Sequence, residues 1–227
     1  MRSWHLMSAL AAGLAVSAAG DRPSRAANPA ASGVVAGAVT ILAGDAPKAD
    51  RSGIAVYLEG VPGEAPAPVV RKMHQQNLMF APGVMIITTG TTIEFPNEDK
   101  VFHNVFSVSS AARFDLGLYK SGTSKSVTFD KPGVVDVYCN IHPQMAAKIK
   151  VIGTRYHAVT SADGSFRIKG VPAGTYPVVA WQAYGDDYRG EVTVAAGGTT
   201  SLSISLVEGK SPTRHLRKDG TPYGRYK

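Results

Sequence analysis

This chain of 227 residues has little of several things, and each scarcity excludes a class of protein. Its single cysteine, Cys139, excludes an internal disulfide framework. The first mostly apolar stretch, residues 6–19, is shorter than the roughly 20 residues that a membrane-spanning helix needs, and no later segment is long and apolar enough, so we expect no transmembrane anchor. Charged residues make up only 18% and apolar residues 44%, a composition typical of a globular chain rather than a disordered one.

The N-terminal segment has the pattern of an export signal. Arg2 precedes the apolar residues 6–19, and small residues occur near the end of that stretch at Val16-Ser17-Ala18 and after it at Ser24-Arg25-Ala26. This order predicts a signal peptide over residues 1–19, with cleavage between residues 18 and 26. We therefore expect an exported, periplasmic protein. In an oxidising compartment a lone thiol is unusual unless something occupies it.

The rest of the chain alternates with period two, and no stripe of helical period stands out, so the sequence predicts an all-β fold. Turn residues such as Asp130-Lys131-Pro132-Gly133 and Asp163-Gly164 separate the alternating runs. Strands that recur every 8–12 residues are typical of sandwiches or barrels. The clearest runs are residues 35–41, 54–58, 84–88, 91–95, 124–129, 134–139, 166–168 and 202–206.

The net charge of +7 is unevenly distributed along the chain. Residues 1–19 carry +1 and residues 210–227 carry +5, which leaves +1 on the folded body. The basic balance therefore does not indicate a nucleic-acid-binding fold. We expect residues 209–227 to be a disordered basic tail that contacts an acidic partner or anionic lipid.

Three side chains of types that bind metals lie at the end of one predicted strand and just after it, in the order Cys139, His142 and Met145. Val135, Val137 and Cys139 share one face of that strand, so the thiol should point into the core. Ile149 and Val151 then resume an inward alternation, with Lys148 and Lys150 on the outer face. A thiolate, an imidazole and a thioether therefore share one tight loop between strands.

The loop needs one more ligand, and His103 is the best candidate. A thiolate and two imidazoles in a trigonal plane, with a weak axial thioether, form the donor set of a blue-copper electron-transfer site. Taken singly, Cys139 and Met145 could be core residues, and His74, His157 and His215 match no motif. Four protein ligands leave no open position for a substrate, and the sequence lacks a His-x-His pair and a Ser-His-Asp signature, so we expect no enzyme.

The segments that contain the candidate ligands, residues 97–105 and 138–145, resemble those of the cupredoxins. The short loop from Cys139 to Met145 resembles that of amicyanin more than that of plastocyanin. The resemblance covers residues 69–152, including Phe80-Ala81-Pro82 and Gly90-Thr91-Thr92-Ile93, and implies a Greek-key β-sandwich with one type 1 copper ion. It implies that His103, Cys139, His142 and Met145 bind the copper. It also implies that Asn104 ties the two ligand loops together, and that Ile141, His142 and Pro143 form the electron-transfer surface. The whole chain also resembles exported proteins of the methylamine-utilisation type.

A second resemblance covers the C-terminal part of the chain. The turns and strand ends from Thr160 to Trp181 resemble the carboxypeptidase regulatory-like, transthyretin-like β-sandwich. Residues 153–208 are few for that sandwich, and residues 33–62 would supply its opening strands. We therefore expect the cupredoxin unit, residues 66–152, to be inserted into the second sandwich. In the alternative, the N-terminal strands extend the cupredoxin and a small module follows it.

These observations favour an exported single-copper electron carrier whose partner is another periplasmic redox protein or a dehydrogenase. Two alternatives stay open. The protein could store or deliver copper, or it could be a binding or structural module with an incidental copper site.

Overall fold

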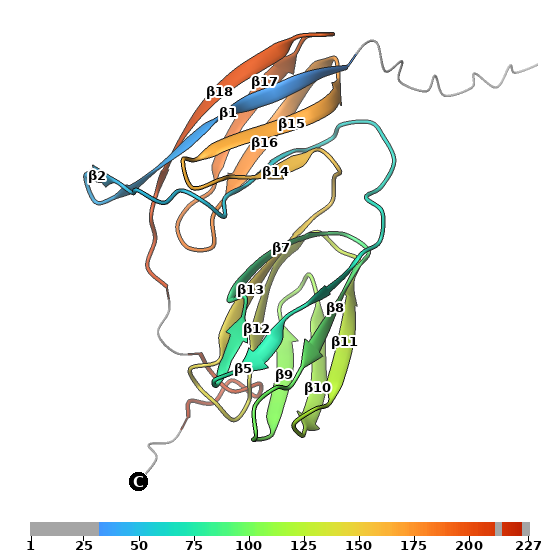
Figure 1. Cartoon of the computed structure of the whole chain (residues 1–227), viewed down its shortest axis with the longest axis vertical. Helices are drawn as coiled ribbons and strands as arrows, with labels where there is room; N and C mark the ends of the chain where they lie inside the picture. The colour runs from blue at the N-terminus through green and yellow to red at the C-terminus, as the bar shows by residue number, and fades with distance from the viewer. Residues whose placement is uncertain (1–31, 212–214, 224–227) are drawn as a thin grey trace, which may run out of the picture.

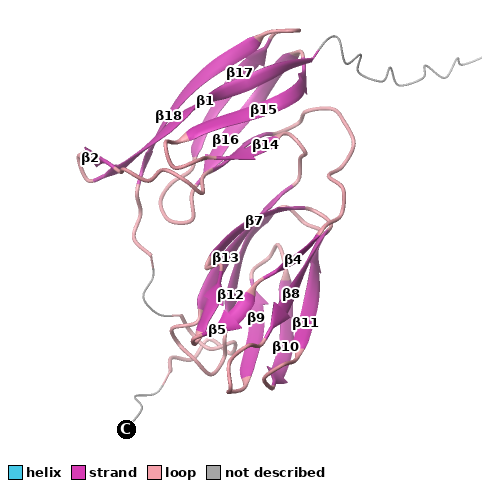
Figure 2. Cartoon of the chain, in the orientation of Figure 1, coloured by secondary structure: helices cyan, strands magenta, loops and turns pink. Residues whose placement is uncertain are grey.

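The structure, a computed structural model, describes residues 32–211 and 215–223 (Figure 1). The predicted signal peptide lies outside these residues. The described part contains strands and no helix, which confirms the all-β fold (Figure 2). Accordingly, no helix among the described residues could cross a membrane. The strands form two β-sandwiches, one above the other in Figure 1.

The upper sandwich combines strands from both ends of the chain. In one of its sheets, β1 lies between β15 and β18; the strands are β15 (Ser165–Pro172), β1 (Ser32–Ala43) and β18 (Thr199–Val207), with β2 (Ala46–Pro47) at the edge. In the other, β3 lies between β14 and β16; the strands are β14 (His157–Val159), β3 (Ala55–Leu58), β16 (Gly174–Trp181) and β17 (Tyr188–Val194). Both N-terminal strands β1 and β3 thus pair with strands that follow residue 153.

The lower sandwich is built from the intervening part of the chain. Its larger sheet has the order β10 (Arg113–Tyr119), β9 (His103–Val108), β12 (Gly133–Tyr138), β13 (Ala146–Ile152) and β7 (Val84–Thr88). Its smaller sheet has the order β11 (Ser124–Phe129), β8 (Thr91–Pro96) and β4 (Val70–Lys72). The hairpin of β5 (His74–Gln76) and β6 (Met79–Ala81) stands beside them. The boundaries of independently folding units stay a prediction.

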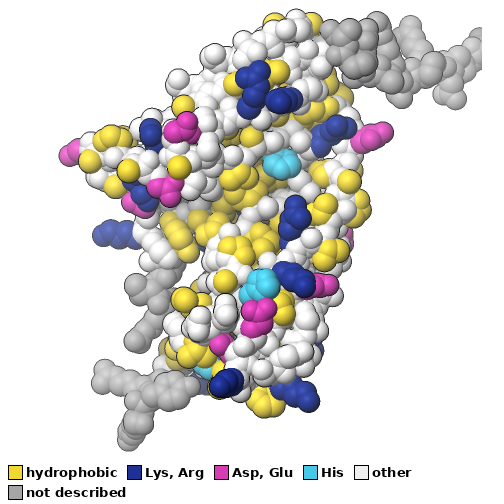
Figure 3. Space-filling view, in the orientation of Figure 1, with side chains coloured by type: hydrophobic (Ala, Val, Ile, Leu, Met, Phe, Trp, Pro, Cys, Tyr) yellow, Lys and Arg dark blue, Asp and Glu magenta, His cyan; other side chains and the backbone are white. Residues whose placement is uncertain are grey.

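An apolar junction joins the two sandwiches. Tyr57 and Trp181 of the upper sandwich pack with Ile152 of the lower one, and hydrophobic side chains gather along this junction in Figure 3. Lys150 lies among them, because its ammonium group is 5.1 Å from the ring centre of Tyr57 and 5.7 Å from that of Trp181. The alternation in the sequence predicts that Lys150 lies on the outer face of its strand. It does lie on the outer face of the lower sandwich, but the upper sandwich covers that face.

Residues 215–223, which belong to the segment expected to be a disordered tail, make defined contacts in the structure. Residues 215–223 lie against the lower sandwich, at the end of the sheet where β12 finishes (Figure 1). Three side chains, His215, Lys218 and Tyr223, make the contacts. The segment has no apolar periodicity, and its attachment depends on these individual side chains rather than on a hydrophobic face.

Candidate metal centre

Cys139 lies directly after β12, at the end of a strand whose inward face is fully buried. Val135, Val137 and Cys139 each have no exposed surface, as the alternation predicts. The thiol is free, and its side chain belongs to the core cluster of the lower sandwich. The main chain then turns back within seven residues. Cys139 N–H donates to the Met145 carbonyl, and Met145 N–H donates to the His142 carbonyl.

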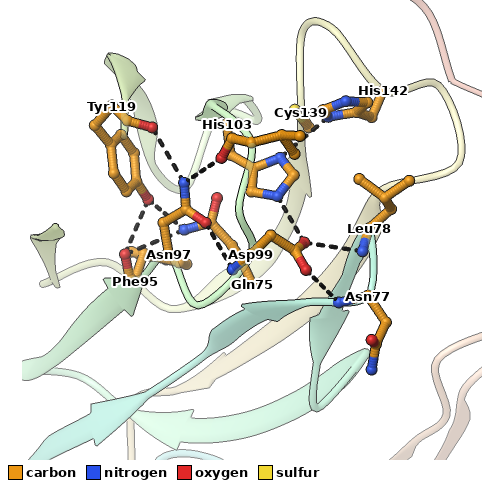
Figure 4. A network of polar contacts seen from close by, with 11 residues as sticks. Gln75, Asn77, Leu78, Phe95, Asn97, Asp99, His103, Tyr119, Cys139 and His142 are labelled. Atoms are coloured by element: carbon orange, nitrogen blue, oxygen red, sulfur yellow. Dashed lines mark hydrogen bonds and ion pairs between the residues drawn. The ribbon is translucent and has the colours of Figure 1, made fainter. Parts of the chain in front are cut away.

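His103 begins β9, beside β12 in the same sheet, and its side chain is completely buried. A loop that precedes β9 is held by Asn97, whose Nδ2 donates to the carbonyls of Val101 and Tyr119. Tyr119 is the residue paired with His103 across β9 and β10. Its hydroxyl donates to the Phe95 carbonyl at 2.9 Å, so the start of β9 is fixed to both sheets (Figure 4).

The structure brings three of the predicted ligands together (Figure 4). Nδ1 of His103 lies 3.1 Å from Nδ1 of His142, and Sγ of Cys139 lies 3.5 Å from that same His142 nitrogen. All three donor atoms lie within 4.8 Å of one another. Nitrogen and sulfur donors that surround one ion at about 2.0–2.3 Å have roughly such separations from each other.

Asp99 fixes the orientation of the His103 ring. Its Oδ2 lies 2.8 Å from His103 Nε2, so Nε2–H donates to the carboxylate and Nδ1 is left free to bind a metal. The same carboxylate accepts the main-chain N–H groups of Asn77 and Leu78 in the β5–β6 turn. Burial raises the pKa of Asp99, but the hydrogen bonds from Leu78, His103 and Asn77 outweigh it and lower the pKa. The carboxylate is therefore ionised at neutral pH.

His142 is the more exposed of the two imidazoles. It is partly buried, as are its neighbours Ile141 and Pro143, so the three predicted surface residues reach solvent together. Burial lowers the pKa of His142, and the nearby His103 lowers it further, while Asp99 opposes the shift. The imidazole is therefore held neutral, the form in which it binds a metal.

Met145, the fourth predicted ligand, ends the same loop with a completely buried side chain. It packs in the core cluster that contains Cys139. Its main-chain hydrogen bonds to His142 and Cys139 close the loop, so the thioether, the thiol and the imidazole come from one hydrogen-bonded turn.

Asn104 does not bridge the ligand loops in the way that the resemblance implies. Its Nδ2 donates to Asp115 Oδ1 in β10 at 2.7 Å, and its Oδ1 is buried without a hydrogen-bond partner. The connection between the loops is indirect. Asp115 also accepts the ammonium group of Lys218, and the main-chain N–H of Lys218 donates to Asn140, next to Cys139.

The sequence reasoning missed several residues at this end of the sandwich. Asp99 was visible as a carboxylate four residues before His103, which was an available signal. Lys218 and Tyr223 gave no signal, since nothing in the sequence places the tail beside the loop. His74 and His157, which match no motif, lie apart from the cluster and contact Glu98 and the Thr154 carbonyl instead.

Two family models match the chain. The model for copper binding proteins of the plastocyanin/azurin family matches residues 67–152, and that for the carboxypeptidase regulatory-like domain matches residues 133–207. The matches overlap over residues 133–152, which the structure places in β12, β13 and the loop between them in the lower sandwich. The first match contains His103, Cys139, His142 and Met145.

Solved structures of copper proteins resemble part of the chain. A reduced mutant of amicyanin is 23% identical, with a TM-score of 0.35, over 37% of this chain and 82% of its own. An oxidised mutant of amicyanin is 24% identical, with a TM-score of 0.34, over 36% of this chain and 80% of its own. A copper-containing nitrite reductase from Thermus scotoductus SA-01 is 30% identical, with a TM-score of 0.36, over 42% of this chain and 24% of its own. No curated protein matches the chain.

Proposed function

We propose that this protein is an exported electron carrier with one type 1 copper ion. The proposal starts from the match of residues 67–152 to the copper binding proteins of the plastocyanin/azurin family. The observation that carries the proposal is the convergence of His103, Cys139 and His142 within 4.8 Å, beside the buried Met145. The first three would hold the ion, and the Met145 thioether would be a fourth, weaker ligand.

The donor set fits copper in both oxidation states. Thiolate and thioether ligands favour Cu(I), whereas imidazoles bind Cu(I) and Cu(II) alike. Bound copper would supply a one-electron couple and would keep the Cys139 thiol as thiolate, which protects it from oxidation. The burial of His103, Cys139 and Met145 excludes water from three of the four ligands.

The chain's own residues would keep the centre rigid. His103 is fixed by Asp99 at one ring nitrogen, and Cys139 is fixed by its main-chain hydrogen bond to Met145. A centre held between strands changes its geometry little when an electron arrives or leaves. Four protein ligands leave no position for a substrate, so we propose electron transfer without catalysis.

The partly exposed His142 would be the route for electrons. Two exposed apolar side chains belong to residues next to this network in the chain or bonded to it: Leu78, whose main-chain N–H donates to Asp99, and Phe102, which precedes His103. Their exposed fractions are 37% and 56%. Together with Ile141 and Pro143 they would form an apolar contact surface for a periplasmic redox protein or a dehydrogenase.

A redox cycle tests the proposal. The purified mature protein is loaded with Cu(II), reduced and reoxidised, while its thiolate-to-copper absorption band is followed. We expect the band to bleach and return over repeated cycles, with the copper still bound. His142→Ala should lose the reversible band, whereas His74→Ala, a histidine outside the cluster, should keep it. Rapid transfer of Cu(I) to a chelator would instead favour copper delivery, and a colourless complex would contradict electron transfer.

A further inference from the structure

The C-terminal residues 215–223 cross the lower sandwich at the same end as the candidate metal centre (Figure 1). The crossing segment is braced internally. Arg217 N–H donates to the Thr221 carbonyl and Gly220 N–H to the Arg217 carbonyl, while the Asp219 carboxylate accepts both the main-chain N–H and the hydroxyl of Thr221. The segment therefore meets the sandwich as a compact turn rather than as an extended strand.

Tyr223 attaches the segment to a metal-binding residue itself. Its hydroxyl donates to the main-chain carbonyl of Cys139 at 2.7 Å. That carbonyl belongs to the point where β12 ends and the ligand loop starts. The contact thus fixes the main chain of the residue that bears the thiol.

Lys218 attaches the segment to both ligand-bearing parts of the chain. Its main-chain N–H donates to Asn140 Oδ1 at 3.0 Å, one residue beyond Cys139. Its ammonium group lies 2.6 Å from Asp115, which in turn accepts Asn104 Nδ2, one residue beyond His103. Lys218 therefore completes a chain of hydrogen bonds from the residue after one ligand to the residue after the other.

His215 adds an aromatic contact to the polar ones. Its ring stacks on Tyr138 with a centroid distance of 4.3 Å and an interplanar angle of 20°. Tyr138 immediately precedes Cys139, and the ring of Tyr223 meets His215 edge-on at 5.3 Å. His215, Tyr223 and the main chain of Lys218 thus contact Tyr138, Cys139 and Asn140, three consecutive residues of the chain.

From these contacts we propose that residues 215–223 form a strap that holds the ligand-bearing segments in place and slows the release of copper. Lys218 and Tyr223 are its positioning residues, since they act on the loop and not on the ion. To release copper, the loop of Cys139, His142 and Met145 must move away from His103, and the strap resists that movement. The inference rests on the proposed function because it assumes that the cluster binds copper.

The test uses the full mature chain and the variants Lys218→Ala, Tyr223→Phe and their combination. Tyr223→Phe removes the hydroxyl and keeps the ring. Lys210→Ala is the matched control, because it removes the same charge from the exposed start of the tail. The first readout is the rate at which Cu(I) passes from the protein to a chromogenic chelator. The second is hydrogen exchange of the amides of residues 139–145 in the metal-free protein.

We expect the double variant to release Cu(I) about tenfold faster than the wild type, which corresponds to about 1.4 kcal/mol. We also expect faster exchange in residues 139–145, with the control unchanged in both readouts. If the wild type takes up no copper, the proposed function fails, and the exchange measurement still decides whether the strap holds the loop. If copper binds and the double variant matches the control in release and in exchange, the strap proposal is wrong.

Discussion

Replacing Asp99 by asparagine should weaken the hydrogen bonds that hold the β5–β6 turn and the one that orients His103. It should therefore change both the free energy of unfolding and the reduction potential of bound copper. The carboxylate accepts three hydrogen bonds, from His103 Nε2 and from the N–H groups of Asn77 and Leu78. Asn77 and Leu78 both have a φ of 56°, a left-handed conformation that asparagine tolerates and that is unfavourable for leucine. The bonds to Asp99 are what offsets that cost.

The size of the effect follows from counting hydrogen-bond donors and acceptors. An asparagine side chain has the same shape as aspartate but only one acceptor oxygen. Its NH₂ group must therefore face one of the N–H groups that donate to the carboxylate in the wild type. One hydrogen bond to a charged group is lost, and the hydrogen bonds that remain are made to a neutral side chain. We expect the free energy of unfolding of the metal-free protein to fall by about 2 kcal/mol.

The reduction potential should rise in the same variant. A hydrogen bond to an ionised group is worth about 1.5–3 kcal/mol and one to a neutral group about 0.5–1.5 kcal/mol. The hydrogen bond to the carboxylate makes the His103 imidazole a stronger donor to the metal and therefore favours Cu(II) over Cu(I). If about 1.4 kcal/mol of that preference is lost, the ratio of the two affinities changes about tenfold and the potential rises by about 59 mV.

Voltammetry of the copper-loaded protein and denaturant unfolding of the metal-free protein measure the two effects. Asp130→Asn is the control, because Asp130 is an exposed carboxylate in the turn before β12, at the opposite end of that strand from Cys139. The six residues of β12 span about 20 Å, roughly twice the screening length at physiological salt. A potential in Asp99→Asn equal to that of Asp130→Asn would refute the reasoning.

Two further predictions concern the frame that holds the site. Gly37→Ala should destabilise the upper sandwich by at least about 3 kcal/mol, because the added Cβ would lie 1.7 Å from the Leu202 carbonyl oxygen in the paired strand β18. Lys150→Met should be neutral or stabilising near neutral pH, because burial lowers the pKa of Lys150 and makes its charge unfavourable in the folded protein. The unfolded chain then binds that proton more tightly. The stability of the wild type relative to Lys150→Met should therefore rise as pH increases toward 10.5.

Each of these predictions has a comparison that can contradict it. Gly44→Ala introduces only the backbone cost of a φ of 63°, about 1 kcal/mol, because no atom lies within 4 Å of its Cβ. If Gly37→Ala unfolds at the same denaturant concentration as Gly44→Ala, the close approach of β1 and β18 is wrong. For Lys150→Met, unfolding is followed between neutral pH and about pH 10.5. A difference from the wild type that stays constant over that range would contradict the buried charge.

The sequence predicted best the strands that have one face in the core. Residues 124–129 and 84–88 were predicted with the bounds that the structure has. Polar and apolar side chains alternate in residues 124–129, whereas residues 84–88 are an apolar run that ends at the turn Thr89-Gly90. The strand β9, which carries His103, was not predicted as a strand. Its first five residues are all buried, since β9 lies inside the sheet between β10 and β12, and a strand of that kind shows no alternation.

The candidate site shows the same division. His103, Cys139, His142 and Met145 are recognisable from the sequence because ligand chemistry restricts residue type and spacing. The role of Asp99 depends on the fold, because its carboxylate accepts a hydrogen bond from Leu78, 21 residues away, as well as one from His103. The position of the tail depends on contacts over still longer separations: Tyr223 lies 84 residues from Cys139. Periodicity describes neighbouring residues and does not register such contacts.

Copper stoichiometry, measured together with the visible spectrum, tests the central claim most directly. The mature protein and its Cys139→Ser variant are titrated with Cu(II), and bound copper is quantified after free copper is removed. We predict one copper ion per wild-type chain with an intense thiolate-to-copper absorption band, and no such band in Cys139→Ser. A wild-type protein that binds no copper, or that binds it without this band, would contradict the account.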